Sequence, residues 1–423
     1  MENVRLLYGS HYQEFLLPLS PTHDVLLPRA AIANGLDPVE LVKTALSTPL
    51  GECKILNNIG GQTQVAISIN DKTRPVPNDL LLDCLLEELR QRGVPDRHIT
   101  LFIASGTHIP MAMDEYHLIL SEKVTSRYRI LAHDCDDDDN LVNLGVTKAG
   151  TPVLINRKFY ESDLKIVVGD IELHHFAGYS GGVKSAAIGL AGRLTINSNH
   201  TLLRDQNSVV AQYEVNPLRM DIEDIGEMAG VDLALNAVLS EEKKVLRAYF
   251  GQPREVMRAG IEAVNSIAQV PIREKYDVVI ASAGGYPKDI NLYQAQKAMT
   301  HASLFCKPGG KIILVAECRE GAGSAGYLQF MQGITSMREV MTRFQQSGFS
   351  VGPHKAFQIA RLLENFDIYL LSSMQPETVK SLLLKPMEVS LGSIRQLIDQ
   401  EPLQSRVAIL PYATACIPIM KME

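Results

Sequence analysis

The stretch Leu164–Ala191, LKIVVGDIELHHFAGYSGGVKSAAIGLA, is the most informative part of the chain. Its apolar and β-branched beginning predicts a buried strand over Lys165–Val168. A glycine-rich turn and a helix of small residues follow this strand. A strand, a flexible turn and a helix start form a cradle for anions, because backbone N–H groups gather there. The adjacent His174 and His175, together with Lys184, indicate that chemistry as well as binding takes place beside this cradle.

The same succession of strand, turn and helix recurs along the sequence. Further strand-like runs lie at Thr63–Ile69, Ile99–Ala104, Val278–Ala281 and Lys311–Val315. A helical pattern covers Asn78–Arg92, with Asn78 as the expected N-cap and Gly93 as the stop. This alternation predicts an α/β fold with mostly parallel sheets flanked by helices.

The chain of 423 residues is too long for a single ordinary core, so we expect two domains. The polar segment Ala268–Asp277 contains Pro271, and a new strand–helix pattern begins after it. We therefore predict an N-terminal α/β domain over residues 1–270 and a smaller α/β domain over residues 271–423. A last strand is expected near residues 406–423, and the sequence is compatible with its joining the sheet of the N-terminal domain.

Composition excludes several classes of protein. The net charge of −7 argues against a nucleic-acid partner, because phosphate binding needs a basic surface. The start MENVRLLYGS lacks a signal-peptide pattern, and no run approaches the ~18 apolar residues of a membrane span. The six cysteines form no CxxC pair, which is typical of reduced thiols. We thus expect a cytoplasmic protein without a membrane partner, and we interpret the acidic run Asp134–Asp139 as a solvated loop.

Four turns that follow strands carry residues suited to anions or proton transfer. Ligands of open α/β sheets bind beyond the carboxyl ends of strands, so these turns are candidates to meet. In the first turn, Arg74 offers a planar fork for a carboxylate or phosphate, and Asp71 is placed to orient it. In the second, Ser105-Gly106-Thr107-His108, the imidazole of His108 is suited to acid–base work at neutral pH.

The third turn, Gly178–Ser185, is close to the phosphate loop GxxxxGK[ST], but Val183 stands where that motif needs glycine. The backbone of Ser180 to Gly182 is predicted to hold a phosphate, and Lys184 to supply charge or a covalent link. His200 follows the helix and can return to the same end of the sheet.

The fourth turn begins at Gly284 and leads into a helical pattern. Tyr293 and Lys297 are four residues apart and share a face, while Gln294 and Lys297 lie one turn apart. Each turn also has an ordinary structural explanation, such as a surface ion pair, a core histidine or an amphipathic helix. The shared layout of all four favours a function, whereas the absence of HExxH and of Cys/His-rich spacing disfavours a zinc hydrolase.

Together these segments resemble the nickel-pincer-nucleotide-dependent lactate racemase family. The motifs that carry the resemblance, in the family's order, are DKTRPVP (71–77), SGTH (105–108), ELHHFAGYSGGVKS (172–185), the NSNH ending at His200, and GGYPKDINLYQAQKAM (284–299). The resemblance implies an isomerase, a racemase or epimerase of lactate or a related 2-hydroxy acid, with its active site in an interdomain cleft. It also implies separate cofactor-biosynthesis proteins as partners.

The implied cofactor is a nickel-pincer nucleotide, pyridinium-3-thioamide-5-thiocarboxylic acid mononucleotide carrying nickel. By resemblance, Lys184 binds it covalently and His200 completes the nickel coordination, while His108 and His174 act as acid and base. The remaining matches are the expected cofactor contacts Asp71, Thr73, Arg74, Ser180, Gly181 and Gly182, and the expected substrate contacts Arg74, Tyr293, Gln294 and Lys297. Two histidines suit racemisation, since hydride leaves one face of the carbon and returns to the other.

The sequence departs from the lactate-specific pattern at several positions. Val183 stands in place of an arginine, Lys72 in place of a histidine and His175 in place of a phenylalanine. The chain has no tryptophan, and the region near His354 replaces an aromatic residue that helps to close the substrate pocket in the family. Because of these departures, the sequence does not specify which 2-hydroxy acid is the substrate. It also does not specify the oligomeric state or the role of His175. Two alternatives stay open as well: a phosphate-loop-like nucleotide-binding enzyme of the kinase or ATPase type, and a non-catalytic carrier of the cofactor.

Overall fold

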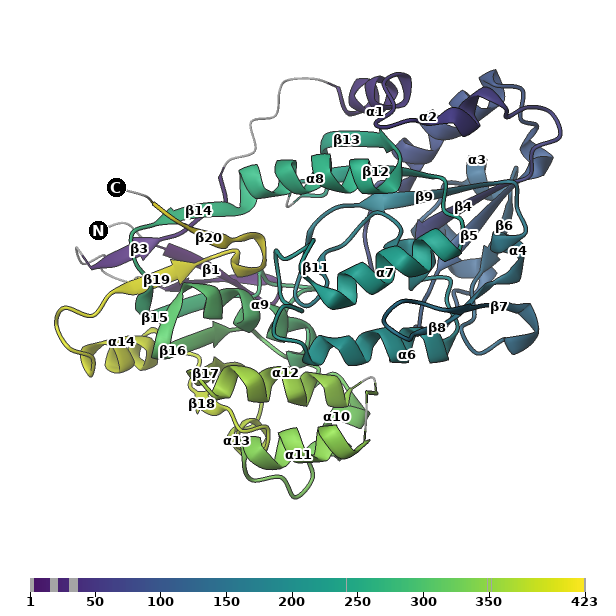
Figure 1. Cartoon of the computed structure of the whole chain (residues 1–423). Helices are drawn as coiled ribbons and strands as arrows, with labels where there is room; N and C mark the ends of the chain where they lie inside the picture. The colour runs from purple at the N-terminus through teal and green to yellow at the C-terminus, as the bar shows by residue number, and fades with distance from the viewer. Residues whose placement is uncertain are drawn as a thin grey trace. The chain divides into compact units, whose positions relative to one another are not determined.

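The structure is a computed structural model that describes residues 4–15, 22–29, 37–240, 242–347, 349–350 and 352–421. It divides into two compact units, each with a sheet and flanking helices (Figure 1). The middle unit comprises Ala31–Ser266, and the terminal unit comprises Met1–Ala30 with Ile267–Glu423.

The middle unit is built on a six-stranded sheet whose strands are parallel except for the antiparallel edge pair β12 and β13. In spatial order the strands are β13 (Val245–Gly251), β12 (Leu233–Leu239), β9 (Leu164–Asp170), β4 (Val65–Asn70), β5 (Ile99–Ala104) and β6 (Arg129–Ala132). The short pairs β7 (Leu141–Val146) with β8 (Pro152–Asn156), and β10 (Leu173–His174) with β11 (Gly178–Tyr179), lie outside this sheet.

Helices cover both faces of the middle sheet. The leucines of α2 recur at helical spacing and pack with α1 against Ile67 and Leu101 in one buried cluster. Phe102, which points to the opposite face, packs edge-on against Phe159 of α4 with ring centroids 5.6 Å apart. The helices of this part of the chain are α1 (Pro38–Ser47), α2 (Asn78–Gln91), α3 (Glu122–Thr125), α4 (Arg157–Tyr160), α5 (Lys184–Ala187), α6 (Arg193–Thr201), α7 (Pro217–Met228) and α8 (Pro253–Ala268).

The predicted start of α2 is wrong in one detail. Pro77 occupies the N-cap position, and Asn78 lies inside the helix, where its side-chain amide donates to the carbonyl of Ile119 at 3.3 Å. That contact with a distant segment removes Asn78 from the capping role. The predicted stop is confirmed, because α2 ends just before Gly93, which has a φ of +86°.

The terminal unit contains a second six-stranded sheet, and all of its strands run parallel. Their order is β18 (Lys385–Met387), β17 (Asp367–Leu371), β16 (Cys306–Val315), β15 (Tyr276–Ser282), β19 (Val407–Leu410) and β3 (His23–Val25). The other elements are β1 (Val4–Tyr8), β2 (His11–Phe15), β14 (Gln269–Ile272), β20 (Ile417–Met420), α9 (Leu292–Phe305), α10 (Ala325–Met331), α11 (Met337–Ser347), α12 (Pro353–Leu363), α13 (Pro376–Ser381) and α14 (Leu391–Asp399). The predicted fold class, with mostly parallel sheets flanked by helices, is confirmed.

The observed division of the chain differs from the predicted domains in its first thirty residues, which belong with the C-terminal part. The reason is that β3 pairs with β19, while Leu6 of β1 is fully buried in the core of the terminal sheet. The last strands also stay in the terminal unit, because β19 lies between β15 and β3 and β20 pairs with β14. The switch between units falls near the predicted position, at Ser266 and Ile267.

Two expectations from composition concern cysteines and membranes. All six cysteines are free, as predicted from their spacing. None of the helices in the described residues has both the length and the apolar character of a membrane span.

A buried histidine joins β6 to the segment before α6. His133 is 1% exposed; its Nε2–H donates to the carbonyl of Ala191 at 3.0 Å, and its Nδ1 accepts from the amide of Asn156 at 3.2 Å. The imidazole is therefore neutral with both nitrogens satisfied. Burial lowers the pKa of His133 below its ordinary value, although the Ala191 carbonyl opposes this effect.

Stability of the middle unit should therefore fall in mild acid. A histidine in the unfolded chain titrates near pH ~6.5, so the contribution of neutral His133 is complete above that pH. It is lost as pH decreases toward the lower pKa of the folded state. We expect the drop in Tm between pH 7 and pH 5 to be smaller in His133→Gln than in the wild type. Equal drops in the two proteins, measured by differential scanning calorimetry, would contradict this prediction.

Candidate active site

Three of the four predicted turns lie at one edge of the middle sheet. They follow β4, β5 and β9, which are parallel neighbours. The backbone N–H of Gly106 donates to the carbonyl of Gly189 at 3.0 Å, which ties the second turn to the segment after Lys184. The fourth turn follows β15 in the terminal unit. The predicted gathering at strand ends is thus observed for the first three turns, and for the fourth it stays a prediction.

His108 and Asp71 form a hydrogen-bonded pair. The Nδ1 of His108 lies 2.7 Å from Oδ2 of Asp71, whose side chain is 5% exposed whereas that of His108 is 53% exposed. Thr73 donates from its hydroxyl to Asp71 Oδ1 at 2.6 Å and from its backbone at 3.1 Å. Because the carboxylate accepts, Nδ1 of His108 carries the proton, and a neutral ring then has its lone pair on Nε2.

The electrostatics of Asp71 agree with this arrangement. Burial acts to raise its pKa, but the hydrogen bonds from His108 and Thr73 outweigh burial and leave the pKa below its usual value. Asp71 therefore stays ionised at neutral pH. The expected orienting of the Arg74 guanidinium by the Asp71 carboxylate is not seen: within the described residues this carboxylate accepts from His108 and Thr73, and Arg74 bonds to Asp71 through its backbone N–H.

His174 has the opposite hydrogen-bonding character. It lies in β10, and its Nδ1 accepts from the backbone N–H of Ala177 at 3.2 Å, which places the ring proton on Nε2. The ring stacks on His175 with centroids 4.8 Å apart and meets Phe176 edge-on at 4.6 Å. His175, left without a role by the sequence, therefore supports the ring of His174.

The glycine turn that contains Gly181 and Gly182 is hydrogen-bonded to a buried arginine, which is itself part of an ion pair. Arg219, 0% exposed, donates to the carbonyls of Tyr179 at 3.0 Å and Gly181 at 3.1 Å and is paired with Glu223 at 2.6 Å. Gly181 and Gly182 adopt φ values of +85° and +57°, which favour glycine.

The amides of the predicted phosphate cradle are partly in use. The N–H of Gly182 donates to Asn236 Oδ1 at 2.7 Å, and the N–H of Ser180 donates to the carbonyl of Glu172 at 2.9 Å. These contacts weigh against the predicted use of the Ser180 and Gly182 amides for a phosphate, and together with Val183 they also weigh against the triphosphatase alternative, because a phosphate loop presents such amides to its ligand.

A substitution at Gly178 tests whether this turn requires glycine. Gly178 has a φ of +74°, and a Cβ at this position would lie 1.7 Å from the carbonyl oxygen of Gln212. We expect Gly178→Ala to lower the free energy of unfolding by about 3 kcal/mol, the sum of backbone strain and overpacking. Gly150→Ala is the matched control, since Gly150 has a φ of +86° but open space around it. Urea unfolding of both should show a clearly larger loss for Gly178→Ala; equal losses would refute the steric reason.

Lys184 begins α5 and is partly buried. Burial, followed by the nearby charges of Arg74 and Arg219, brings its pKa well below the ordinary lysine value. Glu172 and Asp170 oppose this effect but do not reverse it. Lys184 therefore carries a larger neutral fraction than a surface lysine, and the neutral amine is the nucleophilic form.

His200 lies in the last turn of α6. Burial and the charge of Lys184 lower its pKa to about 3, against the raising effect of the Ile196 carbonyl. The structure thus brings His200 and Lys184 within electrostatic range of each other. A neutral imidazole is the form that binds a transition metal.

Asp170 is a further candidate site residue, which the sequence motifs did not reveal. It ends β9 and is 5% exposed. Burial and the charge of Glu172 raise its pKa to about 7, while Lys243 and Arg74 act in the opposite direction. Its position at the carboxyl end of a central strand was the signal that could have identified it.

The predicted substrate residues other than Arg74 lie on α9 of the terminal unit. Asn291 caps this helix, accepting from the N–H of Gln294 at 3.1 Å, and Lys297 donates to Gln294 Oε1 at 2.9 Å. The ring of Tyr293 contacts the ring of His354 at 5.7 Å and the ammonium of Lys355 at 4.7 Å. The predicted proximity of Gln294 and Lys297 is confirmed, and His354 contacts Tyr293, one of the predicted substrate residues.

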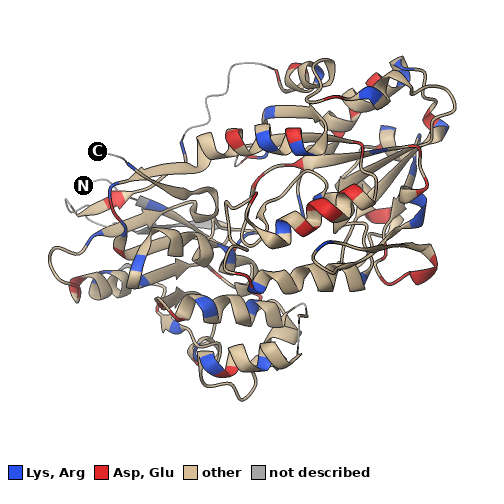
Figure 2. Cartoon of the chain, viewed as in Figure 1, with Lys and Arg blue, Asp and Glu red and all other residues tan. Residues whose placement is uncertain are grey.

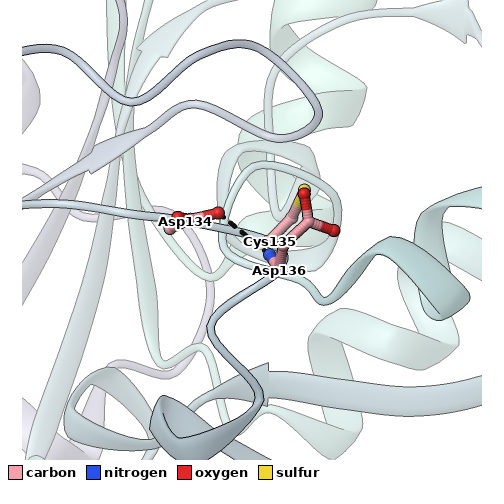
Figure 3. Close-up of side chains that lie close together, drawn as sticks. All are labelled: Asp134, Cys135 and Asp136. Atoms are coloured by element: carbon pink, nitrogen blue, oxygen red, sulfur yellow. Dashed lines mark hydrogen bonds between the residues drawn. The ribbon is translucent and has the colours of Figure 1, made fainter.

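One acidic group in the middle unit has ligand atoms spaced for a metal (Figure 3). Atoms of Asp134, Cys135 and Asp136 lie within 4.8 Å of one another. Both oxygens of Asp136, however, accept from the guanidinium of Arg193 at 2.6 Å, and burial raises the pKa of the Cys135 thiol. Since both aspartates are exposed and Asp136 is already paired, the predicted solvated loop describes this segment.

The fold and these side chains define an α/β protein with histidine, lysine and carboxylate side chains gathered at the carboxyl ends of parallel strands. Comparison with known proteins identifies the family. Residues 8–211 match the family model described as lactate racemase N-terminal domain, and residues 272–417 match the lactate racemase C-terminal domain. The chain therefore belongs to the lactate racemase family, and it is an isomerase.

Individual relatives agree with this assignment. The lactate racemase of Thermoanaerobacterium thermosaccharolyticum is 30% identical over 393 residues, 91% of this chain and 92% of that protein. The lactate racemase of Lactiplantibacillus plantarum is 32% identical over 314 residues, 74% of each chain. The solved structure of the T. thermosaccharolyticum lactate racemase apoprotein superposes with a TM-score of 0.91 at 28% identity, covering 99% of this chain and 100% of that one. A Thermotoga maritima protein, 19% identical with a TM-score of 0.65 over 90% of this chain and 98% of that one, shares the fold.

Proposed function

We propose that this protein racemises lactate or a related 2-hydroxy acid with a nickel-pincer nucleotide bound covalently to Lys184. The grouping of His108, His174, Lys184 and His200 around the end of β9 and its neighbours carries the proposal. The two further classes weighed from the sequence receive less support. A carrier would not need the Asp71–His108 pair, and a triphosphatase would need amides that the protein already uses.

The residues present fit such a cofactor. The hydroxyl of Ser185, next to Lys184, is buried and has no hydrogen-bond partner among the described residues, which marks a polar group awaiting a ligand. The lowered pKa of Lys184 enlarges its neutral, nucleophilic fraction, and the lowered pKa of His200 keeps its imidazole neutral. An imidazole beside sulfur donors is a suitable environment for nickel. When bound, the cofactor would supply the acceptor and donor of hydride, which no side chain can provide.

The two histidines divide the proton chemistry. His108, oriented by Asp71, offers the Nε2 lone pair and is suited to remove the hydroxyl proton of one enantiomer. His174 presents Nε2–H, since Ala177 occupies its Nδ1, and is suited to donate a hydrogen bond to the substrate oxygen. These opposite characters allow His108 to accept the hydroxyl proton and to return it, while His174 holds the substrate oxygen through a hydrogen bond from its Nε2–H.

Four residues are proposed to bind the substrate carboxylate: Arg74, Tyr293, Gln294 and Lys297. The guanidinium of Arg74 supplies a bidentate partner, and Lys297, fixed by Gln294, supplies a second positive charge. Burial raises the pKa of Tyr293 to about 12, so its phenol stays a hydrogen-bond donor. A carboxylate held in this way leaves the α-carbon to change configuration.

The test is racemisation by the loaded protein. The chain is co-expressed with the cofactor-making proteins and incubated with L-lactate, and D-lactate is measured on a chiral column. The chain expressed alone is the control and should be inactive and free of nickel. A panel of other 2-hydroxy acids then ranks substrates by kcat/KM. Absence of interconversion for every acid, together with tight ATP–magnesium binding, would overturn the proposal.

A further inference from the structure

A fully buried polar network lies behind His200. It begins on α7, a helix rich in acidic residues (Figure 2). Asp221 of this helix is 1% exposed and accepts hydrogen bonds from the hydroxyls of Thr147 and Thr151, the latter at 2.8 Å. The side-chain amide of Asn199, on α6, donates to Asp221 Oδ2 at 2.9 Å. The helices α6 and α7 pack together, so this network joins them.

The side chain of Asn199 can take only one orientation in this network. Its Nδ2 also donates to the backbone carbonyl of Leu218 at 3.1 Å. A carbonyl only accepts, so turning the amide over would place oxygen against oxygen at Leu218 and also lose the bond to Asp221. Asn199 is 0% exposed, and an unsatisfied group there would cost about 1–3 kcal/mol. The amide oxygen must therefore face away from both acceptors.

That oxygen faces His200. Asn199 Oδ1 lies 3.1 Å from His200 Nδ1, and the backbone carbonyl of Ile196 is a second acceptor beside the ring. Because an amide oxygen only accepts, the hydrogen bond requires the proton of a neutral His200 to be on Nδ1. The lone pair of the ring is then on Nε2.

We infer that Asn199, locked by Asp221 and Leu218, is a positioning residue that fixes the tautomer of His200 and presents its Nε2 as the metal-binding atom. The part of the inference that concerns the metal rests on the proposed function. Ligating histidines usually donate their second N–H to such a partner, and loss of the partner typically weakens metal binding 10–100-fold. In this protein the partner is the side-chain amide of Asn199, and its orientation is set by the hydrogen bond to Asp221.

The experiment reads the tautomer directly in the apoprotein. Long-range ¹H–¹⁵N correlation spectra of the histidine-labelled chain distinguish Nδ1–H from Nε2–H, and His200→Gln identifies the signals of His200. We expect His200 to be protonated on Nδ1 in the wild type and to shift toward Nε2–H or a mixture in Asn199→Ala. Thr151→Val is the matched control: it removes one hydrogen bond from the same network but leaves Asn199 in place. It should keep the wild-type tautomer.

Two outcomes overturn the inference: a wild-type His200 protonated on Nε2, or an unchanged tautomer in Asn199→Ala. The first needs no variant, so the test holds even if Asn199→Ala fails to fold. In the loaded protein, nickel release to a chelator should be at least 10-fold faster in Asn199→Ala than in Thr151→Val, with the Lys184 adduct intact. Equal release rates would also contradict the role toward the metal. If the wild-type chain shows the expected tautomer but never takes up nickel, the proposed function fails while the tautomer assignment stands.

Discussion

Lys184→Ala is expected to abolish both covalent attachment of the cofactor and racemisation. The amine of Lys184 is the proposed nucleophile, and no neighbouring side chain offers the same group at the start of α5. Intact-protein mass spectrometry after co-expression should show the adduct on the wild type and an unmodified mass for the variant. Lys184→Arg is the control for charge, because it keeps a cation but cannot be acylated in the same way. An adduct that persists in either variant would refute the attachment site.

The lowered pKa of Lys184 makes a second readout possible in the apoprotein. Each unit by which a lysine pKa falls raises its neutral fraction about tenfold at neutral pH. We therefore expect a small amine-directed reagent to modify Lys184 at pH 7 faster than Lys148, whose side chain is 86% exposed. The advantage should be largest near neutral pH, where a lowered pKa changes the neutral fraction of Lys184 most. Peptide mapping measures both rates, and faster labelling of Lys148 at pH 7 would count against an activated Lys184.

The sequence predicted the turns of the site better than the buried residues whose hydrogen bonds position those turns. His108, His174 and Lys184 stand in short motifs next to strands, and local pattern is enough to place them at a sheet edge. Arg219 and Asn199 act through partners elsewhere in the chain: Asn199 meets Asp221 only after α6 and α7 have packed, and Arg219 meets Gly181 only after α7 has packed against the glycine turn. Composition and periodicity carry no signal for such a contact.

The domain division shows the same limit. The segment after Ala268 reads as a boundary because its local pattern changes. Nothing local in β3, a three-residue strand, reveals that it pairs with β19 almost four hundred residues later. Long-range strand pairing depends on the completed sheet, so the assignment of the first thirty residues required the structure.

Asp71→Asn should reduce kcat for racemisation by about 10²–10⁴-fold, the range expected when a histidine base loses the carboxylate that sets its tautomer. The asparagine has the same shape, but its amide can donate to His108 Nδ1, which would move the ring proton to Nε2. The atom proposed to accept the hydroxyl proton would then already carry one. The loss should appear in both directions of the reaction, because the same group takes the proton from one enantiomer and returns it to form that enantiomer.

A matched control separates this effect from simple disturbance of the turn. Thr73→Val removes the hydroxyl that donates to Asp71 Oδ1 at 2.6 Å, while the bond from His108 to Oδ2 stays. We expect its kcat to fall less than about tenfold, since one neutral hydrogen bond contributes roughly 1 kcal/mol. Both variants should carry the Lys184 adduct, which intact mass verifies before kinetics are compared. Equal kcat values for Asp71→Asn and Thr73→Val would mean that the carboxylate holds the turn rather than the tautomer of His108, and proton removal would then have to be assigned to another group.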